Sequence, residues 1–154
     1  MSLWCRCLSR RRGDLQRRML FQEQFERIKA VYPGTSYVCL LDGDSGDMIA
    51  QSETTEVNTD EFTRTIINLK DAALQFAATL NQIDPQVVHV RARRACFPVT
   101  ALLTWCILAF YSEMPGVDME LFDCFEADKS IEPITGELHR ILDANQGTKR
   151  RYRA

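Results

Sequence analysis

The sequence predicts an α+β fold, in which an antiparallel sheet of about five strands carries a long amphipathic helix on one face and the N- and C-terminal helices on the other. From Phe62 to Ile83, apolar residues recur every three or four positions, which is the period of a helix with one buried face. Short apolar or alternating segments at 36–41, 87–93 and 105–111 have the composition of strands. No internal repeat is visible, so one domain is expected.

The chain is expected to divide into a basic leader, a domain and a basic tail. Residues 1–13 are predicted to be a disordered leader, residues 14–145 the domain, and residues 146–154 the tail. A first helix should begin near Asp14 and stop at Pro33-Gly34. Its predicted apolar face consists of Leu15, Met19, Phe21, Phe25, Ile28 and Val31.

A β-hairpin follows this helix. Ser36 to Leu41 is apolar on both faces, which is typical of an interior strand, and Met48 to Gln51 returns beside it. The Asp-, Gly- and Ser-rich turn at 42–47 tolerates left-handed backbone. Its three aspartates also resemble a cation loop, but the flanks are strand-like and no closing glutamate is in place. We therefore interpret it as a hairpin turn and expect no metal site.

The long helix is expected to start at an N-cap formed by Asn58, Thr59 or Asp60 and to end before Pro85. Its core-facing stripe is predicted to be Phe62, Ile66, Leu69, Ala73, Phe76, Leu80 and Ile83. Ile67 and Leu74 lie off this stripe and form a second apolar patch, which is interpreted either as the edge of the core or as an interface.

The strand after the long helix alternates strictly. Its small apolar residues, Val88, Val90 and Ala92, face one way. Its basic residues, His89, Arg91 and Arg93, face the other way. At the edge of a sheet, such a strand would present unpaired backbone groups that invite another strand.

Two more strands and two helices should complete the domain. Strands are expected near Ala95–Thr100 and Trp105–Tyr111, with a turn within 100–104. Asp118 can cap a first helix, and a second should start at Ser130 with Pro133 in its first turn. The apolar positions of these helices are Met119, Leu121, Phe122 and Phe125, then Ile134, Leu138, Ile141 and Leu142.

Charge and cysteine usage restrict the functional classes. The net charge is −2, but both ends are basic and the body is acidic, which argues against nucleic-acid binding by the folded part. Solvated tails are favoured over ends that touch a microtubule, RNA or lipid headgroups. The six cysteines lack metal-site spacings and sit mostly in apolar segments, which indicates a reducing compartment. Cys5 and Cys7 could carry acyl chains and bring the leader to a membrane, a less favoured alternative.

Enzymatic function is not expected. The sequence has no glycine-rich phosphate loop and no G-x-S-x-G motif. His89 and His139 have no recognisable catalytic partner, and Cys96 beside Phe97 and Pro98 has the surroundings of an inert buried thiol. We predict a non-enzyme without a cofactor.

One segment resembles a known family. Ile83-Asp84-Pro85-Gln86 followed by the basic alternating strand, and the apolar hairpin ending at Trp105–Phe110, are similar to the roadblock-type light chains of dynein, in the roadblock/longin-like superfamily. The resemblance covers about residues 22–113. It implies a roadblock/profilin-like dimer, with itself or a related chain, in which the long helices pair and the strands after them join. It also implies a light chain that binds the dynein intermediate chain on the microtubule cytoskeleton, in cytoplasmic or axonemal (cilium or flagellum) transport.

The resemblance assigns roles to particular residues. The dimer interface would include Ile67, Leu74, Val88, Val90 and Ala92. His89, Arg91 and Arg93 would bind acidic residues of a partner, and the alternative interpretation is that they form an ordinary exposed strand face.

The C-terminal helices depart from the minimal light chains. Superfamily members that scaffold or regulate small GTPases do carry a helix there, so a GTPase scaffold or regulator at a membrane surface is the alternative function. A third interpretation, a ligand-sensing domain with a related sheet, would need a pocket.

Overall fold

The structure is a computed structural model of the whole chain. It describes the backbone of residues 3–32, 34–53, 57–81, 87–91, 95–103, 106–113 and 123–151. Side chains are described for residues 12–32, 34–53, 57–81, 106–113, 123 and 126–144.

The centre of the fold is one antiparallel sheet with the strand order β2-β1-β5-β4-β3. The strands are β1 (Thr35–Asp42), β2 (Met48–Gln51), β3 (Val87–Arg91), β4 (Ala95–Leu103) and β5 (Cys106–Glu113). β1 pairs with β2 on one side and with β5 on the other, and its two faces contribute to two separate cores, which explains why it is apolar on both faces. The predicted α+β class and antiparallel sheet are confirmed, and β4 extends three residues past the predicted strand end at Thr100.

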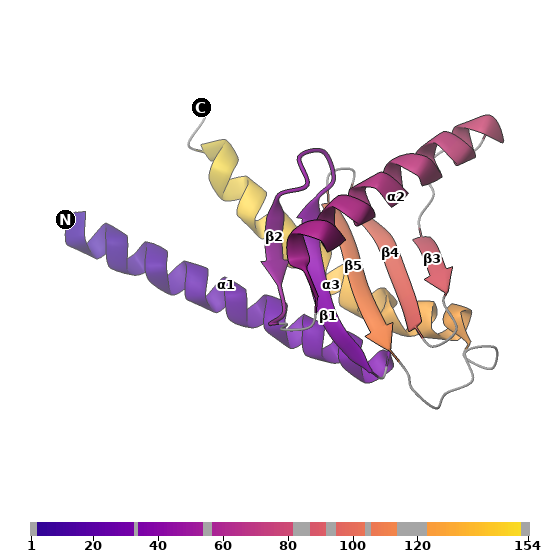
Figure 1. The fold of residues 1–154 in the computed structure, drawn as a ribbon. Coiled ribbons are helices and arrows are strands. Elements are labelled where there is room, and N and C mark those ends of the chain that lie inside the picture. The colour runs from indigo at the N-terminus through magenta and orange to yellow at the C-terminus, as the bar shows by residue number, and fades with distance from the viewer. Residues whose placement is uncertain are drawn as a thin grey trace.

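Three helices cover the sheet: α1 (Leu3–Val31), α2 (Thr59–Thr79) and α3 (Cys124–Arg151). Figure 1 shows α2 crossing one face, while α1 and α3 lie on the other. The alternation of side chains along β1 and β5 produces the two faces, because neighbouring residues of a strand point in opposite directions.

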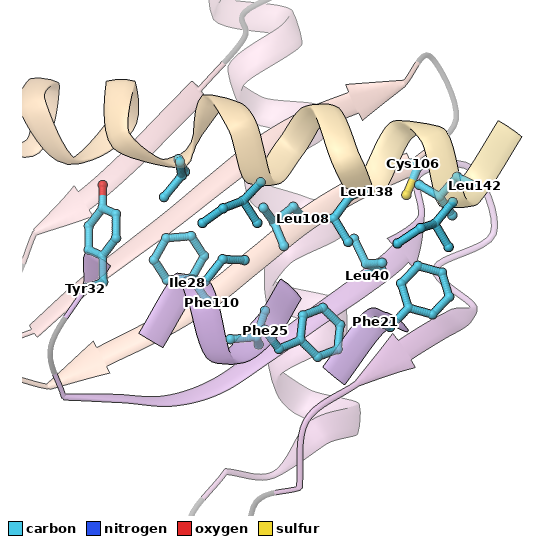
Figure 2. Packing of buried hydrophobic residues seen from close by; sticks show 14 of the residues in the cluster. Phe21, Phe25, Ile28, Tyr32, Leu40, Cys106, Leu108, Phe110, Leu138 and Leu142 are labelled. Carbon is cyan, nitrogen blue, oxygen red and sulfur yellow. The ribbon is translucent and has the colours of Figure 1, made fainter. Parts of the chain in front are cut away.

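The larger core lies between the sheet and the pair α1 and α3 (Figure 2). It contains the aromatic residues Phe21, Phe25, Tyr32 and Phe110, whose side chains are 0–2% exposed. The Tyr32 and Phe110 rings meet edge to face with their centroids 4.8 Å apart. The remaining members include Ile28, Val38, Leu40, Leu108, Ile131, Ile134, Leu138, Ile141 and Leu142.

The smaller core lies under α2. It consists of Tyr37, Cys39, Leu41, Ile107 and Ala109 from the sheet and Ile66 from the helix. The rings of Tyr37 and Phe62 meet edge to face at 5.3 Å. Only the first half of α2 contributes to this core, because its other partly buried members on α2 are Phe62, Ile67 and Leu69.

α1 differs from the prediction at its start. It begins at Leu3 and not at Asp14, so the backbone of residues 3–13 is helical where a disordered leader was expected. Leu15 and Met19 are exposed, although they were predicted to face the core. Their helical positions are turned away from those of Phe21 and Phe25 by about 120° on average, because each residue turns the helix by about 100°.

α3 begins at Cys124, six residues before the helix start predicted at Ser130. Its N-cap is Asp123, whose carboxylate accepts a hydrogen bond from the Glu126 amide at 3.0 Å. Pro133 therefore lies inside the helix and not in its first turn. Ile131 and Ile134, both buried, hold the helix to the core on either side of the proline. The helix predicted from Asp118 lies outside the described residues, as far as Phe122.

The turn between β1 and β2 is a hairpin turn, as predicted. One carboxylate oxygen of Asp42 accepts hydrogen bonds from the amides of Asp44 and Ser45, each at 2.9 Å. These bonds hold the pKa of the Asp42 carboxyl below its ordinary value. Gly46 takes a φ of +77°, which glycine adopts without strain. The Lys70 ammonium on α2 donates to the Gly43 carbonyl and joins the turn to the helix.

Candidate interaction surface

The start of α2 is fixed by its cap. The Asn58 side chain accepts a hydrogen bond from the Glu61 amide at 3.1 Å, which selects Asn58 from the three predicted candidates. Asp60 and Glu61 add negative charge at the positive end of the helix dipole. The helix ends at Thr79, where Asn81 takes a positive φ of 53°. Pro85, predicted to end it, lies outside the described residues.

The second half of α2 and its C-cap residue carry apolar side chains that the described part of the chain leaves uncovered. Leu74 is 43% exposed, Phe76 69% and Leu80 55%. We call these three residues the helix patch. The prediction that Phe76 and Leu80 face the core is wrong, because α2 is about 30 Å long and its C-terminal half extends past the sheet (Figure 1). They continue the stripe of Phe62 and Ile66 beyond the strands that bury it.

The helix patch lies toward the β3 side of the sheet, where α2 leads on to β3 (Figure 1). β3 pairs with β4 on one side, with Val88 opposite Val99 and Val90 opposite Phe97. Within the described part of the chain, no strand lies on its other side. A free strand edge and an exposed apolar helix half therefore occur at the same end of the sheet.

The predicted interface residues differ in their surroundings and in how much of them the structure describes. Ile67 packs beside the smaller core, and its position is explained within one chain. Leu74 belongs to the helix patch. Val88 and Val90 lie in β3, of which the backbone alone is described, and Ala92 lies outside the described residues. Their assignment to an interface stays a prediction.

The predicted partner-binding residues are also untested. His89 and Arg91 lie in β3 with backbone positions only, and Arg93 lies outside the described residues. Sequence reasoning missed Phe76 and Leu80 as surface residues. The available signal was length, since the apolar stripe is longer than the width of the strands beneath it.

The two buried thiols whose side chains are described are weak nucleophiles near neutral pH. Cys39 and Cys106 are free and buried, as predicted. Burial raises the pKa of each thiol from 9.0 to about 12. Both groups therefore stay protonated near neutral pH, where the thiolate would be the reactive form.

A hollow of about 810 Å³ lies between α1 and β2. Its lining is mainly polar and includes Arg17, Arg18, Lys29 and Glu53 beside Met48. Small-molecule sites are usually lined mostly by apolar groups, so this hollow gives little support to the ligand-sensing interpretation. Within the described residues, no cluster of His, Cys, Asp and Glu is placed to hold a metal ion.

No family model matches the sequence, and no curated protein matches it. The gliding protein MglB from Thermus thermophilus superposes with a TM-score of 0.65 at 16% identity, over 84% of this chain and 90% of that one. MglB from Myxococcus xanthus gives a TM-score of 0.60 at 16% identity, over 78% and 98% of the two chains.

A third structure connects this fold to its class. A Roadblock/LC7 domain from Streptomyces avermitilis superposes with a TM-score of 0.61 at 14% identity, over 75% of this chain and 91% of the domain. The chain therefore has a roadblock/longin-like fold. Two of these three similar structures are MglB proteins.

Proposed function

We propose that this protein is a dimeric, non-catalytic binding module that scaffolds or regulates a small GTPase. The observation that carries the proposal is the combination of the helix patch with the free edge of β3 at one end of the sheet. Both features are surfaces that a second protein chain can cover, and neither is suited to chemistry on a small substrate.

Pairing of two copies would satisfy both features together. A second β3 beside the first would extend the sheet and would pair the outward backbone groups of the edge strand. A two-fold axis at this edge would also bring the two copies of α2 together, so that Leu74, Phe76 and Leu80 could pack on their counterparts. Large aromatic side chains such as Phe76 are enriched in protein interfaces relative to the rest of the surface.

The choice of a GTPase over the dynein intermediate chain rests on α3. The superfamily members linked to small GTPases carry a helix after the last strand, as this chain does, whereas the minimal dynein light chains do not. α3 packs through Ile131, Leu138 and Leu142 onto the sheet face opposite α2, which would leave that face closed to a partner. The structural likeness to MglB agrees with this choice, and the dynein light-chain interpretation gains no support from the structures described above.

The dimer can be tested with substitutions that leave the core intact. Phe76→Glu places a charge on a side chain that is 69% exposed, so the chain should fold but lose its self-association. Met19→Glu makes the same kind of change at a residue 65% exposed on α1 and serves as the control. Sedimentation velocity at micromolar concentration should show dimers for the wild type and Met19→Glu, and monomers for Phe76→Glu. A wild type that is monomeric at these concentrations would contradict the proposal.

A third variant tests the sheet edge. Val90→Arg, in β3, should prevent dimerisation or folding. An unchanged soluble dimer in light scattering would show that β3 does not join its counterpart.

The partner can be tested by affinity purification from the cells that produce the protein, with either a non-hydrolysable GTP analogue or GDP present. We expect a small GTPase whose capture depends on the nucleotide, and direct binding of that GTPase by the purified full chain. Capture of a dynein intermediate chain without a GTPase would favour the light-chain function and would overturn the proposal.

A further inference from the structure

One end of the molecule concentrates positive charge. α1 and α3 run in opposite directions. The Tyr32 hydroxyl near the end of α1 donates a hydrogen bond to the Asp128 carboxylate near the start of α3 at 2.9 Å, which places these two helix ends side by side. Phe21 and Leu142 lie at the other end of the same core (Figure 2). The start of α1 and the end of α3 therefore leave the sheet on the same side, as Figure 1 shows.

The charge separation is large. Residues 3–20 contain six arginines and one acidic residue, and residues 144–151 contain three basic residues and no acidic one. Residues 21–143 contain nine basic and twenty acidic residues. The sequence thus concentrates basic residues in the two helix ends of an otherwise acidic protein.

This basic end also carries an exposed apolar stripe. Leu15 and Met19 are one helical turn apart and are 61% and 65% exposed. Arg12 and Arg18 are exposed beside them. In the sequence, Trp4 and Leu8 precede Leu15 by eleven and seven residues, which correspond to about three and two helical turns. In a helix, these positions therefore fall on the same side as Leu15. α1 therefore has one apolar side for the core and, in its first half, another that the described part of the chain leaves uncovered.

We propose that this end binds the surface of a membrane that contains anionic lipids. The α1 stripe, defined by Leu15 and Met19, would lie at the boundary between headgroups and acyl chains, and the arginines would contact lipid phosphates. Amphipathic helices with basic residues beside a stripe of large apolar residues bind membranes in this way. None of the helices that the structure describes has the length and apolar character needed to span a bilayer.

The apolar stripe distinguishes a lipid surface from other polyanions. RNA or DNA would attract the arginines through their phosphates, but that attraction would not use Leu15 and Met19. The helical start of α1 is the observation that changes the interpretation of this segment, because a disordered leader would not gather its apolar residues on one side. The inference does not depend on the GTPase or on dimerisation, since the helix patch and β3 lie away from this end (Figure 1).

The test is co-sedimentation of the full chain with vesicles of phosphatidylcholine alone or mixed with phosphatidylserine. We expect binding to the mixed vesicles that weakens as salt is raised, and little binding to neutral ones. Arg12→Gln with Arg18→Gln should weaken binding by roughly 25-fold, because each arginine near an anionic surface contributes about fivefold. Leu15→Gln with Met19→Gln should weaken it by at least about tenfold at unchanged charge.

A matched control removes the same charge elsewhere. Arg64 and Lys129 are exposed on α2 and α3, outside the basic end, so Arg64→Gln with Lys129→Gln should leave vesicle binding nearly unchanged. Circular dichroism and thermal unfolding of each variant establish that it is folded.

Three results would overturn the proposal. The first is no binding to anionic vesicles at low salt. The second is equal weakening by the Arg64 and Lys129 control, which would place the contact elsewhere. The third is an affinity for anionic vesicles that the Leu15 and Met19 substitutions leave unchanged, together with displacement of the vesicles by RNA. That result would identify the basic end as a nucleic-acid surface.

Discussion

Leu138→Ala should destabilise the domain by about 3 kcal/mol, within the roughly 2–5 kcal/mol observed for truncating a fully buried leucine. Leu138 is fully buried, and Figure 2 shows it on α3 beside Leu40 and Leu108 of the sheet. Truncation removes apolar contacts and leaves a space between helix and sheet, both of which cost free energy. In a chain of this size, about 3 kcal/mol lowers the melting temperature by roughly 6–12 °C.

The control for this prediction is Leu15→Ala, which removes the same atoms from a leucine that is 61% exposed. Its free energy of unfolding should change by less than about 0.5 kcal/mol. Urea unfolding followed by circular dichroism measures both variants. A loss below about 1 kcal/mol for Leu138→Ala, or an equal loss for the two variants, would show that α3 does not contribute to the core as described.

Four other predictions concern helix propensity, thiol reactivity and titration. Gly136→Ala should stabilise the protein by roughly 0.5–1 kcal/mol in thermal unfolding, because Gly136 is inside α3 and an added methyl group would meet no atom within 4 Å; a lower melting temperature would contradict this. The thiols of Cys39 and Cys106 should resist iodoacetamide in the native protein at about pH 8, when peptides are mapped by mass spectrometry. Because burial raises each thiol pKa from 9.0 to about 12, the unfolded state ionises first, and stability should fall as the pH rises from about 9 to 12. The pKa of Asp42 should lie below 3.8 in a carboxyl NMR titration, so its contribution to stability is complete above that pH and is lost as the pH falls; a value at or above 3.8 would refute the turn geometry.

The elements that the sequence predicted well have local signals. The hairpin of β1 and β2 follows from an apolar run, a turn rich in Asp and Gly, and a second apolar run, all within seventeen residues. The start of α2 follows from Asn58 and from the acidic residues after it. The edge position of β3 has no such local signal: it was expected from the resemblance, in which the strand after the long helix joins its counterpart, and the strand order places β3 at the end of the sheet.

The errors arise where sequence cannot specify what covers a surface. Periodicity showed that α2 has an apolar stripe, but it did not show how far along the helix the sheet extends. Phe76 and Leu80 were therefore assigned to the core. The arginines before Asp14 suggested disorder, although arginine is a good helix former and the segment continues a helix that the core already holds. Pro133 was placed in a first turn because a proline inside a helix is costly, and the buried residues on both sides of it offset that cost.

The shared exit of α1 and α3 has a practical consequence for work in cells. A fluorescent protein fused to either end of this sequence would be carried on the basic side, next to the surface proposed to meet lipid. Such fusions should leave self-association intact while crowding the membrane contact. Imaging with them would therefore report too little membrane-bound protein, and antibody staining of the unfused chain would give the more faithful distribution.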